Sequence, residues 1–268
     1  MRLPLWQIDA FTDHVFSGNP AAVCLLDAWL PDETLAAIAA ENNLAETAFL
    51  VREPAGWRIR WFTPEVEVDL CGHATLASGH VFFSRVDPGA RAVTFASQSG
   101  PLTVTREDDG RLALTLPRRA PRRCPVPPPL VRALGREPLE TLAARDLLAV
   151  LATEAEVRAL ALDGAAFGAL AELPHLGVIV TAPASTPGLD FVSRFFAPKV
   201  GIPEDPVTGS AHCTLTPYWA KRLGKARLEA AQVSKRGGRL SCEDRPEAET
   251  VGIAGRVAQY LEGFVDLP

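Results

Sequence analysis

The feature of this sequence that most constrains its fold is an internal repeat. Arg60–Val66, with the sequence RWFTPEV, is echoed about half the chain length later by Arg194–Val200, with the sequence RFFAPKV. An aspartate and then a run of small residues follow each copy, Gly72–Leu76 in the first half and Gly209–Ala211 in the second. Because similarity over so long a period marks repeated structural units, we expect the chain to contain two copies of one structural plan.

A proline-rich segment lies between the two copies. Pro117–Pro129 has prolines at close intervals, and proline fits neither a helix interior nor the middle of a sheet. The sequence therefore predicts an N-terminal lobe at residues 1–118 and a C-terminal lobe at residues 124–268. The C-terminal strand could pack back on the first lobe.

Apolar periodicity predicts many short strands, with one helix near the centre of each half. The two central helices are expected at His73–Ser84 and Ser210–Leu223. Strands are expected at Leu5–Phe11, Thr47–Arg52, Trp57–Phe62, Val93–Gln98, Leu102–Arg106, Leu112–Leu116, Gly177–Thr181, Arg227–Gln232 and Gln259–Val265, and further helices at Asp32–Asn42, Leu130–Leu134 and Glu154–Leu162. This pattern indicates an α+β fold of two pseudo-symmetric lobes, each a curved, mainly antiparallel, barrel-like sheet around a central helix.

Composition and charge argue against several classes of function. The net charge is -5, and the chain has no basic stripe that could neutralise a phosphate backbone. We therefore expect no nucleic-acid partner. No apolar run is long enough to cross a bilayer, and the first residues are too polar for a secretory signal. We expect no membrane association and a cytoplasmic location.

The cysteines are scattered and odd in number, which is typical of reduced thiols rather than of a disulfide framework. They are Cys24, Cys71, Cys124, Cys213 and Cys242. Neither they nor the histidines show the paired spacing of a zinc motif, so we expect no metal site. His212 and Cys213 are interpreted as packing residues.

The run of small residues in each half is expected at a strand-to-helix turn. Glycine lets a backbone approach a ligand, and the free N–H groups of a first helical turn attract anions. Gly72 in one half, with Gly209 and Ser210 in the other, could therefore bind a substrate carboxylate. The alternative is that these glycines only allow close packing of helix on sheet.

Glu46 is the candidate acid/base residue. It lies among apolar residues, in the sequence Asn42–Leu50, at the expected start of a strand, and the second half has no equivalent carboxylate. In a cleft it could exchange a proton with a substrate. From its spacing alone, a solvated glutamate at a strand end is the more ordinary interpretation.

Three further polar residues stand near the same turns. His73 and Asp205 lie close to the two helix starts, where they could orient a substrate or move a proton. Asp205 could instead cap its helix. Asn19 follows Gly18 and precedes Pro20, an ordinary turn sequence, although its amide could also reach a ligand.

Four segments in this order resemble the PhzF-like isomerases of the phenazine biosynthesis family. They are Asp9–Thr12 with Gly18–Val23, Asn43–Phe49, Asp69–Thr75 and Glu204–Ala211. The resemblance implies a diaminopimelate-epimerase-like fold, usually assembled as a homodimer. It also implies an isomerase that needs no cofactor and acts on a small carboxylate-bearing substrate, cyclic or amino-acid-like. In the phenazine enzyme, a proton is relocated on trans-2,3-dihydro-3-hydroxyanthranilate.

The resemblance also assigns roles to individual residues. Glu46 corresponds to the catalytic acid/base, His73 and Asp205 to its polar partners, and Gly72 and Ser210 to helix starts that bind the carboxylate. The epimerases of this fold instead use two cysteines, one at each helix start. Cys71 stands at the first such position, but Asp205 and Pro206 stand where the second thiol is expected.

Two alternatives to the isomerase stay open at this point. One is an amino-acid epimerase or racemase that uses Cys71. The other is a protein of the same fold that binds a small acid without catalysis, because a fold alone does not determine chemistry.

Overall fold

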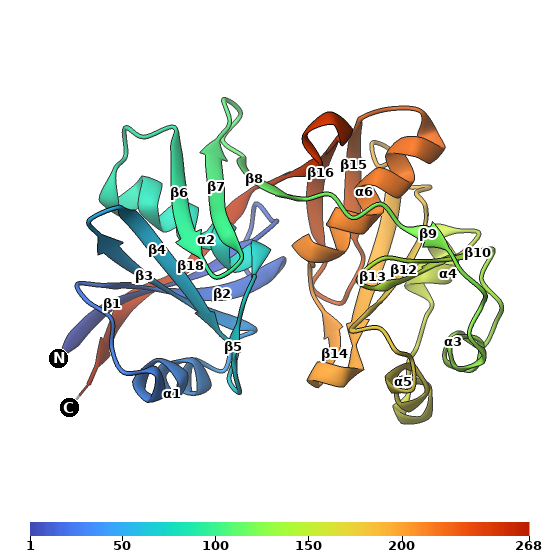
Figure 1. The fold of residues 1–268 in the computed structure, drawn as a ribbon, viewed down its shortest axis with the longest axis horizontal. Helices are drawn as coiled ribbons and strands as arrows, with labels where there is room; N and C mark the ends of the chain where they lie inside the picture. Colours follow the sequence, from blue (N-terminus) through green and yellow to red (C-terminus); the bar gives the residue numbers. More distant parts are fainter. Residues whose placement is uncertain (268) are drawn as a thin grey trace. The chain divides into compact units, whose positions relative to one another are not determined.

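The computed structural model describes residues 1–267, without the side chain of Val200, so the last residue of the predicted lobe 124–268 lies outside the described residues. The chain forms two compact units (Figure 1). Unit 1 comprises Met1–Leu116 together with Ile253–Pro268, and unit 2 comprises Pro117–Gly252.

Unit 1 is built mainly from strands, with one surface helix and one central helix. Its elements are β1 (Arg2–Ala10), β2 (Asn19–Leu26), α1 (Asp32–Asn42), β3 (Glu46–Glu53), β4 (Gly56–Phe62), β5 (Glu67–Val68), α2 (Gly72–Val81) with a π-helical turn at Phe82–Val86, β6 (Ala92–Ser97), β7 (Gly100–Arg106), β8 (Leu112–Pro117) and β18 (Val257–Asp266). The strand β18 pairs antiparallel with β1, so the C-terminal end of the chain completes the unit that the N-terminal end begins.

Helix α2 is the core element of unit 1. Nine of its ten residues are buried, and Figure 1 shows it among the strands of the unit. A Cβ atom at Gly79 would come within 2.6 Å of Val104 Cγ1 on β7, so glycine allows this close approach of helix and strand. The buried hydroxyl of Ser78 donates to the Ala74 carbonyl, 2.7 Å away, which satisfies it inside the apolar core.

Unit 2 contains β9 (Arg122–Arg123), α3 (Pro128–Leu134), β10 (Glu140–Ala143), β11 (Leu147–Val150), α4 (Glu154–Arg158), α5 (Gly164–Ala171), β12 (Val178–Pro183), β13 (Phe191–Ala197), a 3-10 turn at Pro198–Val200, β14 (Ile202–Asp205), α6 (Gly209–Leu223), β15 (Arg227–Gln232), β16 (Gly238–Arg245) and a 3-10 turn at Pro246–Ala248. Strand β17 (Thr250–Gly255) crosses the boundary with unit 1. Helix α6 is buried from Ala211 to Ala220 and is the core helix of this unit.

The two units repeat one order of strand pairing. In unit 1, β1 pairs antiparallel with β2, β2 parallel with β3, β3 antiparallel with β4, β4 parallel with β6, and β6 antiparallel with β7. In unit 2 the same directions recur in β10 with β11, β11 with β12, β12 with β13, β13 with β15, and β15 with β16. The repeat found in the sequence is therefore a repeat of topology.

A partly buried arginine–glutamate pair marks the same place in both repeats. Arg60 on β4 donates two hydrogen bonds to Glu67 on β5, both of 2.7 Å, and Arg194 on β13 donates two to Glu204 on β14, of 2.6 and 3.0 Å. Such bidentate pairs fix geometry as well as adding stability. Each pair therefore fixes the short strand that leads into the core helix of its unit.

The main predicted elements are confirmed, while their boundaries and some short elements differ. Helix α1 and strand β15 have the predicted bounds, but α4 ends at Arg158 rather than at Leu162. The Leu160 carbonyl accepts a hydrogen bond of 2.6 Å from Arg194, a tertiary contact that local sequence does not reveal. Helix α5 was not predicted, because its glycines and alanines give little amphipathic pattern.

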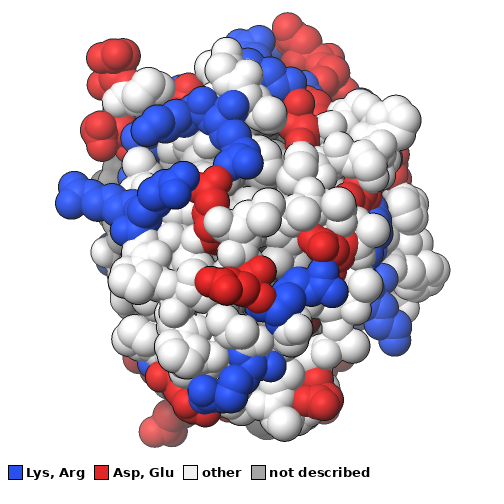
Figure 2. Space-filling view, turned by 90° about the vertical axis from the view of Figure 1, so that its right-hand side faces the viewer, with Lys and Arg blue, Asp and Glu red and all other residues white. Residues whose placement is uncertain are grey.

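Among the described residues, no helix combines the length and the apolar character needed to cross a bilayer. On the face shown in Figure 2, positive and negative side chains are interspersed.

Candidate active site

The candidate site of unit 1 lies where two strands begin beside the first turn of α2. Asn19 is the first residue of β2, and Glu46 is the first residue of β3, which runs parallel to β2. Parallel strands bring equivalent ends to the same edge of a sheet. His73 is the second residue of α2, and its side chain meets both Asn19 and Glu46.

The His73 imidazole has different partners on its two nitrogens. Its Nε2 atom is 3.1 Å from a carboxylate oxygen of Glu46, and its Nδ1 atom is 3.2 Å from Nδ2 of Asn19. Nε2 and the Glu46 oxygen are not aligned as a hydrogen bond, so their contact is a close charge contact. When His73 is neutral, Nδ1 accepts from Asn19 and the remaining ring proton sits on Nε2, facing Glu46.

Exposure distinguishes the two members of this pair. The His73 side chain is 6% exposed, whereas the Glu46 side chain is 15% exposed. Asn19 is fully buried. The Glu46 carboxylate is therefore the group that a small molecule can reach, and His73 and Asn19 support it from within the protein.

Cys71 is the third neighbour of His73. It precedes α2 directly, and its Sγ atom is 3.5 Å from His73 Nδ1. Burial raises the pKa of the Cys71 thiol to about 11, and the charge of Glu46 adds to the rise. The thiol is thus protonated near neutral pH.

The pKa of His73 is also raised, but for a different reason. Burial by itself lowers the pKa of the imidazole, but the contacts with Cys71 and Glu46 outweigh burial and raise that pKa well above its ordinary value. A carboxylate beside a histidine that readily holds a proton is an arrangement suited to proton transfer.

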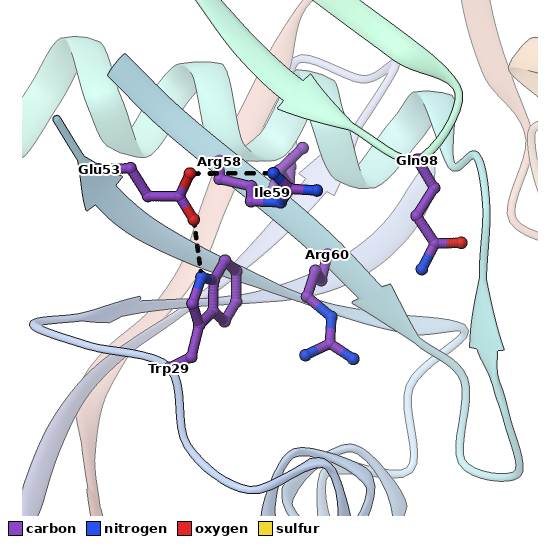
Figure 3. A pocket seen from close by; sticks show the side chains of 6 residues that line it. All are labelled: Trp29, Glu53, Arg58, Ile59, Arg60 and Gln98. Atoms are coloured by element: carbon purple, nitrogen blue, oxygen red, sulfur yellow. Dashed lines mark hydrogen bonds and ion pairs between the residues drawn. The ribbon is translucent and has the colours of Figure 1, made fainter. Parts of the chain in front are cut away.

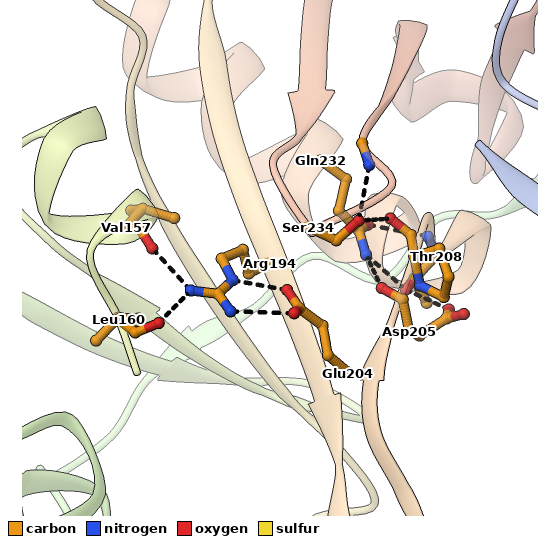
Figure 4. A network of polar contacts seen from close by, with 10 residues as sticks. Val157, Leu160, Arg194, Glu204, Asp205, Thr208, Gln232 and Ser234 are labelled. Atoms are coloured by element: carbon orange, nitrogen blue, oxygen red, sulfur yellow. Dashed lines mark hydrogen bonds and ion pairs between the residues drawn. The ribbon is translucent and has the colours of Figure 1, made fainter. Parts of the chain in front are cut away.

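In unit 2, the predicted residue Asp205 is held in a different kind of network (Figure 4). It ends β14, and its carboxylate accepts a hydrogen bond from the Thr208 hydroxyl. The Gln232 side chain donates to the Asp205 carbonyl at 2.7 Å and accepts from the Thr208 backbone N–H at 2.9 Å. The turn before α6 is therefore fixed by side chains from two strands.

The predicted residues Gly209 and Ser210 form the first turn of α6. Gly209 is buried, while Ser210 is partly exposed. Helix α6 has no side-chain cap at Thr208, its N-cap residue. In α2 the corresponding N-cap is Cys71 and the first residue is Gly72, so the two helix starts are built alike.

Strand register shows why only one unit carries a glutamate at this place. Thr47 pairs with Phe62, and Val178 pairs with Phe196, so Gly177 stands where Glu46 stands in the first repeat. A Cβ atom at Gly177 would lie 2.3 Å from the Phe195 ring. The position in unit 2 therefore has no room for a side chain.

Strand register also corrects the sequence comparison of the two repeats, which matched Asp205 with Asp69. Asp205 pairs with Phe195, as Val68 pairs with Trp61, so Asp205 corresponds to Val68 rather than to Asp69. The counterpart of Cys71 is accordingly Thr208, and neither Asp205 nor Pro206 takes the place of a second thiol.

A separate cavity of about 380 Å³ lies on unit 1 (Figure 3). It is lined by Trp29, Glu53, Arg58, Ile59, Arg60 and Gln98, and by none of the predicted site residues. Its polar groups already have protein partners: Glu53 accepts from the Trp29 indole at 3.0 Å, and Arg60 binds Glu67. The cluster of Glu46, His73, Asn19 and Cys71 is therefore the better candidate for the chemistry.

Sequence reasoning singled out the residues of this cluster and Asp205, but it missed the side chains that hold Asp205 in unit 2. Thr208 and Gln232 were not predicted, because their role depends on contacts across the fold. Thr208 could have been identified as a residue of the helix start, because it directly precedes the glycine with which the helix begins.

Comparisons with known proteins show the family of the chain and agree with its duplicated fold. The family model described as "Phenazine biosynthesis-like protein" (PhzC-PhzF) matches the chain twice, over residues 8–130 and 131–263. A protein of Pseudomonas aeruginosa, named as an uncharacterized isomerase, is 52% identical over 267 residues, covering 100% of both chains. The two family matches follow the repeat seen in the topology.

Solved structures agree with the fold. The crystal structure of a phenazine biosynthesis protein of the PhzF family from Enterococcus faecalis is 46% identical, with a TM-score of 0.94 and 100% coverage of both chains. A hydroxyproline epimerase from Agrobacterium vitis, only 10% identical, has a TM-score of 0.61 over 98% of this chain and 92% of that one. The predicted α+β, diaminopimelate-epimerase-like fold is thus confirmed.

Proposed function

The chain belongs to the phenazine biosynthesis-like family of isomerases, and from that premise we propose that it relocates a proton on a small carboxylate-bearing substrate, with Glu46 as the acid/base. The observation that carries this proposal is the pairing of the accessible Glu46 carboxylate with the buried His73 imidazole at 3.1 Å.

In the proposed reaction, the Glu46 carboxylate takes a proton from a substrate carbon and becomes a carboxylic acid. The electron pair left on the substrate shifts into its conjugated system, and Glu46 then returns the proton to a different carbon. One proton leaves and one returns, so the reaction needs no net oxidation or reduction. His73 orients the carboxylate, and Asn19 in turn orients His73.

The substrate is proposed to be a cyclic or amino-acid-like carboxylic acid. Gly72, Gly209 and Ser210 belong to first helical turns, whose N–H groups favour a carboxylate. Asp205, held by Thr208 and Gln232, is proposed to bind a polar substituent of the substrate. These assignments stay predictions for substitution experiments.

The central test is Glu46→Gln, assayed against a panel of small acids that includes trans-2,3-dihydro-3-hydroxyanthranilate. We expect kcat to fall by about 10²- to 10⁴-fold, the usual contribution of a general acid/base. The amide keeps the size of the side chain, so the rise in melting temperature caused by a bound acid should persist. Glu53→Gln, at the other end of β3, is the matched control and should keep full turnover. Near-normal turnover of Glu46→Gln would contradict the assignment of Glu46 as the acid/base residue.

The epimerase alternative requires a thiolate on each side of the substrate. The Cys71 thiol is buried with a raised pKa, and its counterpart is Thr208. We therefore favour isomerisation, which differs from epimerisation in its products: an epimerase inverts a stereocentre and incorporates solvent deuterium there. The homodimer implied by the resemblance stays a prediction, which light scattering during size-exclusion chromatography tests.

A further inference from the structure

The side chains around His73 combine three types of metal-ligating atom. Within the described part of the chain, Glu46, Cys71 and His73 each offer one ligand atom, and these atoms lie within 4.8 Å of one another. The sequence indicated no metal site, because its cysteines and histidines show no paired ligand spacing, and Glu46 comes from another element. Folding brings the three together.

One distance in the cluster, between Cys71 and His73, matches that between neighbouring ligands of one ion. In a tetrahedral zinc site, with Zn–S of about 2.3 Å and Zn–N of about 2.0 Å, adjacent S and N atoms are about 3.5 Å apart. The Cys71 Sγ and His73 Nδ1 atoms are 3.5 Å apart. The carboxylate of Glu46 stands at the end of a flexible side chain, so a small rotation can bring an oxygen to the same ion.

A second observation concerns unsatisfied buried atoms. His73 Nε2 and Glu46 Oε2 are both buried and lie 3.1 Å from each other, in a contact that is not aligned as a hydrogen bond. A buried polar atom without a hydrogen bond is costly, and a bound ion is one way to satisfy it. His73 is also 5% exposed, so it lies in the interior beside the accessible carboxylate.

We propose that Glu46, Cys71 and His73 form a binding site for a divalent transition-metal ion of the zinc type, which competes with catalysis. A thiolate, an imidazole and a carboxylate together favour Zn²⁺ or Co²⁺ over Mg²⁺ or Ca²⁺, which prefer oxygen ligands. The ion binds Sγ, one imidazole nitrogen and one carboxylate oxygen, and water completes its coordination. Binding releases the thiol proton to solvent, together with the imidazolium proton when His73 carries one.

Metal binding and catalysis exclude one another in this scheme. A Glu46 carboxylate that coordinates a cation no longer takes a proton from carbon. If the ion binds Nδ1 of His73, the contact between that atom and Asn19 is also lost. Inhibition by the ion rests on the proposed function of Glu46, whereas binding of the ion does not.

The test uses Co²⁺, whose bond to a thiolate gives a charge-transfer absorption band in the near ultraviolet. We expect the complete, reduced protein, freed of metal by a chelator and kept under anaerobic conditions, to show this band on titration with Co²⁺. Zn²⁺ should then displace Co²⁺ and abolish the band. Absence of the band from the unaltered protein overturns the proposal.

Two cysteine substitutions identify the ligand. Cys71→Ser should lose the band, whereas Cys213→Ser, a change at a buried cysteine of the other core helix, should keep it. Circular dichroism of each variant checks that it is folded. If Cys71→Ser is unfolded, His73→Asn provides the second variant, and it should shift or abolish the band. A band that survives in folded Cys71→Ser overturns the proposal.

Activity provides a separate readout. Micromolar Zn²⁺ should inhibit turnover reversibly, with recovery on addition of a chelator. A cobalt band without inhibition leaves the metal site standing and contradicts the role of Glu46. Turnover that depends on Glu46, without any cobalt band, contradicts only the metal site.

Discussion

Asn19 and His73 are 54 positions apart in the sequence, yet the amide Nδ2 of Asn19 lies 3.2 Å from the imidazole Nδ1 of His73. Both side chains are buried, so this contact fixes the ring orientation that directs Nε2 toward Glu46. Three elements, β2, β3 and α2, thus contribute one polar chain inside an apolar core.

Asn19→Asp should change the pH dependence of turnover. A carboxylate next to Nδ1 stabilises the imidazolium, so the pKa of His73 should rise further and the alkaline limb of the kcat profile, where His73 loses its proton, should move to higher pH. Asn19→Ala should instead lower kcat without that displacement, because it removes orientation but adds no charge. Identical pH profiles for the two variants would contradict an orienting role.

His73→Gln should lower kcat by about 10²-fold, the lower end of acid/base contributions. The Glu46→Gln and His73→Gln changes should not be additive when combined, because residues that act as a unit lose their joint effect once either is gone. Additive losses in a double-mutant cycle on kcat would mean that the two residues act independently.

Substitutions of two neighbouring carboxylates on β14 should distinguish a residue that stabilises the fold from one that binds the substrate. Glu204→Gln weakens the partly buried bidentate pair with Arg194, and should lower the free energy of unfolding by about 1–3 kcal/mol with little effect on KM. Asp205→Asn should raise KM with little effect on stability, because Thr208 can still donate to an amide oxygen. Denaturant unfolding and steady-state kinetics of both variants check this contrast.

Cys71→Ser should retain turnover of the same order as the unaltered protein. Its thiol is protonated near neutral pH because burial raises its pKa to about 11. For the same reason, iodoacetamide should react with Cys71 in the folded protein far more slowly than with a free thiol, which peptide mass spectrometry can follow. Loss of all turnover in a folded Cys71→Ser protein would revive the epimerase alternative.

His212 should make stability fall at mildly acidic pH. Burial lowers its pKa to about 4 in the folded protein, against about 6.5 in an unfolded chain. Below about pH 6.5 the unfolded state takes up the proton first, so each unit of pH down to about 4 costs up to about 1.4 kcal/mol.

His212→Gln can keep a hydrogen bond to the Thr208 carbonyl, which His212 Nδ1 meets at 2.8 Å, and it removes the titration. Its unfolding free energy should therefore vary less between pH 7 and pH 4 than that of the unaltered protein. Parallel pH dependences for the two proteins in chemical denaturation would exclude this cause.

The sequence revealed the parts of this fold that local pattern controls. The repeated RWFTPEV and RFFAPKV segments predicted the duplication, and the apolar periodicity predicted both core helices. The site was harder, because Glu46 looks like an ordinary strand-end residue until β2 and β3 are paired. Register between strands is a tertiary property, and so Gly177 could not be identified as its counterpart from sequence.

Long-range polar contacts account for the remaining differences. The roles of Thr208 and Gln232 arise from bonds between a helix start and a strand 24 positions away. The proximity of Cys71 and His73 to Glu46 likewise follows from packing of α2 on the sheet. Residue types at these positions indicate chemistry, but only packing determines which of them meet.

The crowding at Gly177 has an evolutionary consequence. In a duplicated fold, the second repeat could in principle acquire a carboxylate at the position that corresponds to Glu46 in the first. Here that path requires Phe195 to move or to be replaced, because its ring fills the space 2.3 Å from the missing Cβ atom of Gly177. Directed evolution toward a symmetric, two-carboxylate descendant should therefore begin with a smaller residue at position 195.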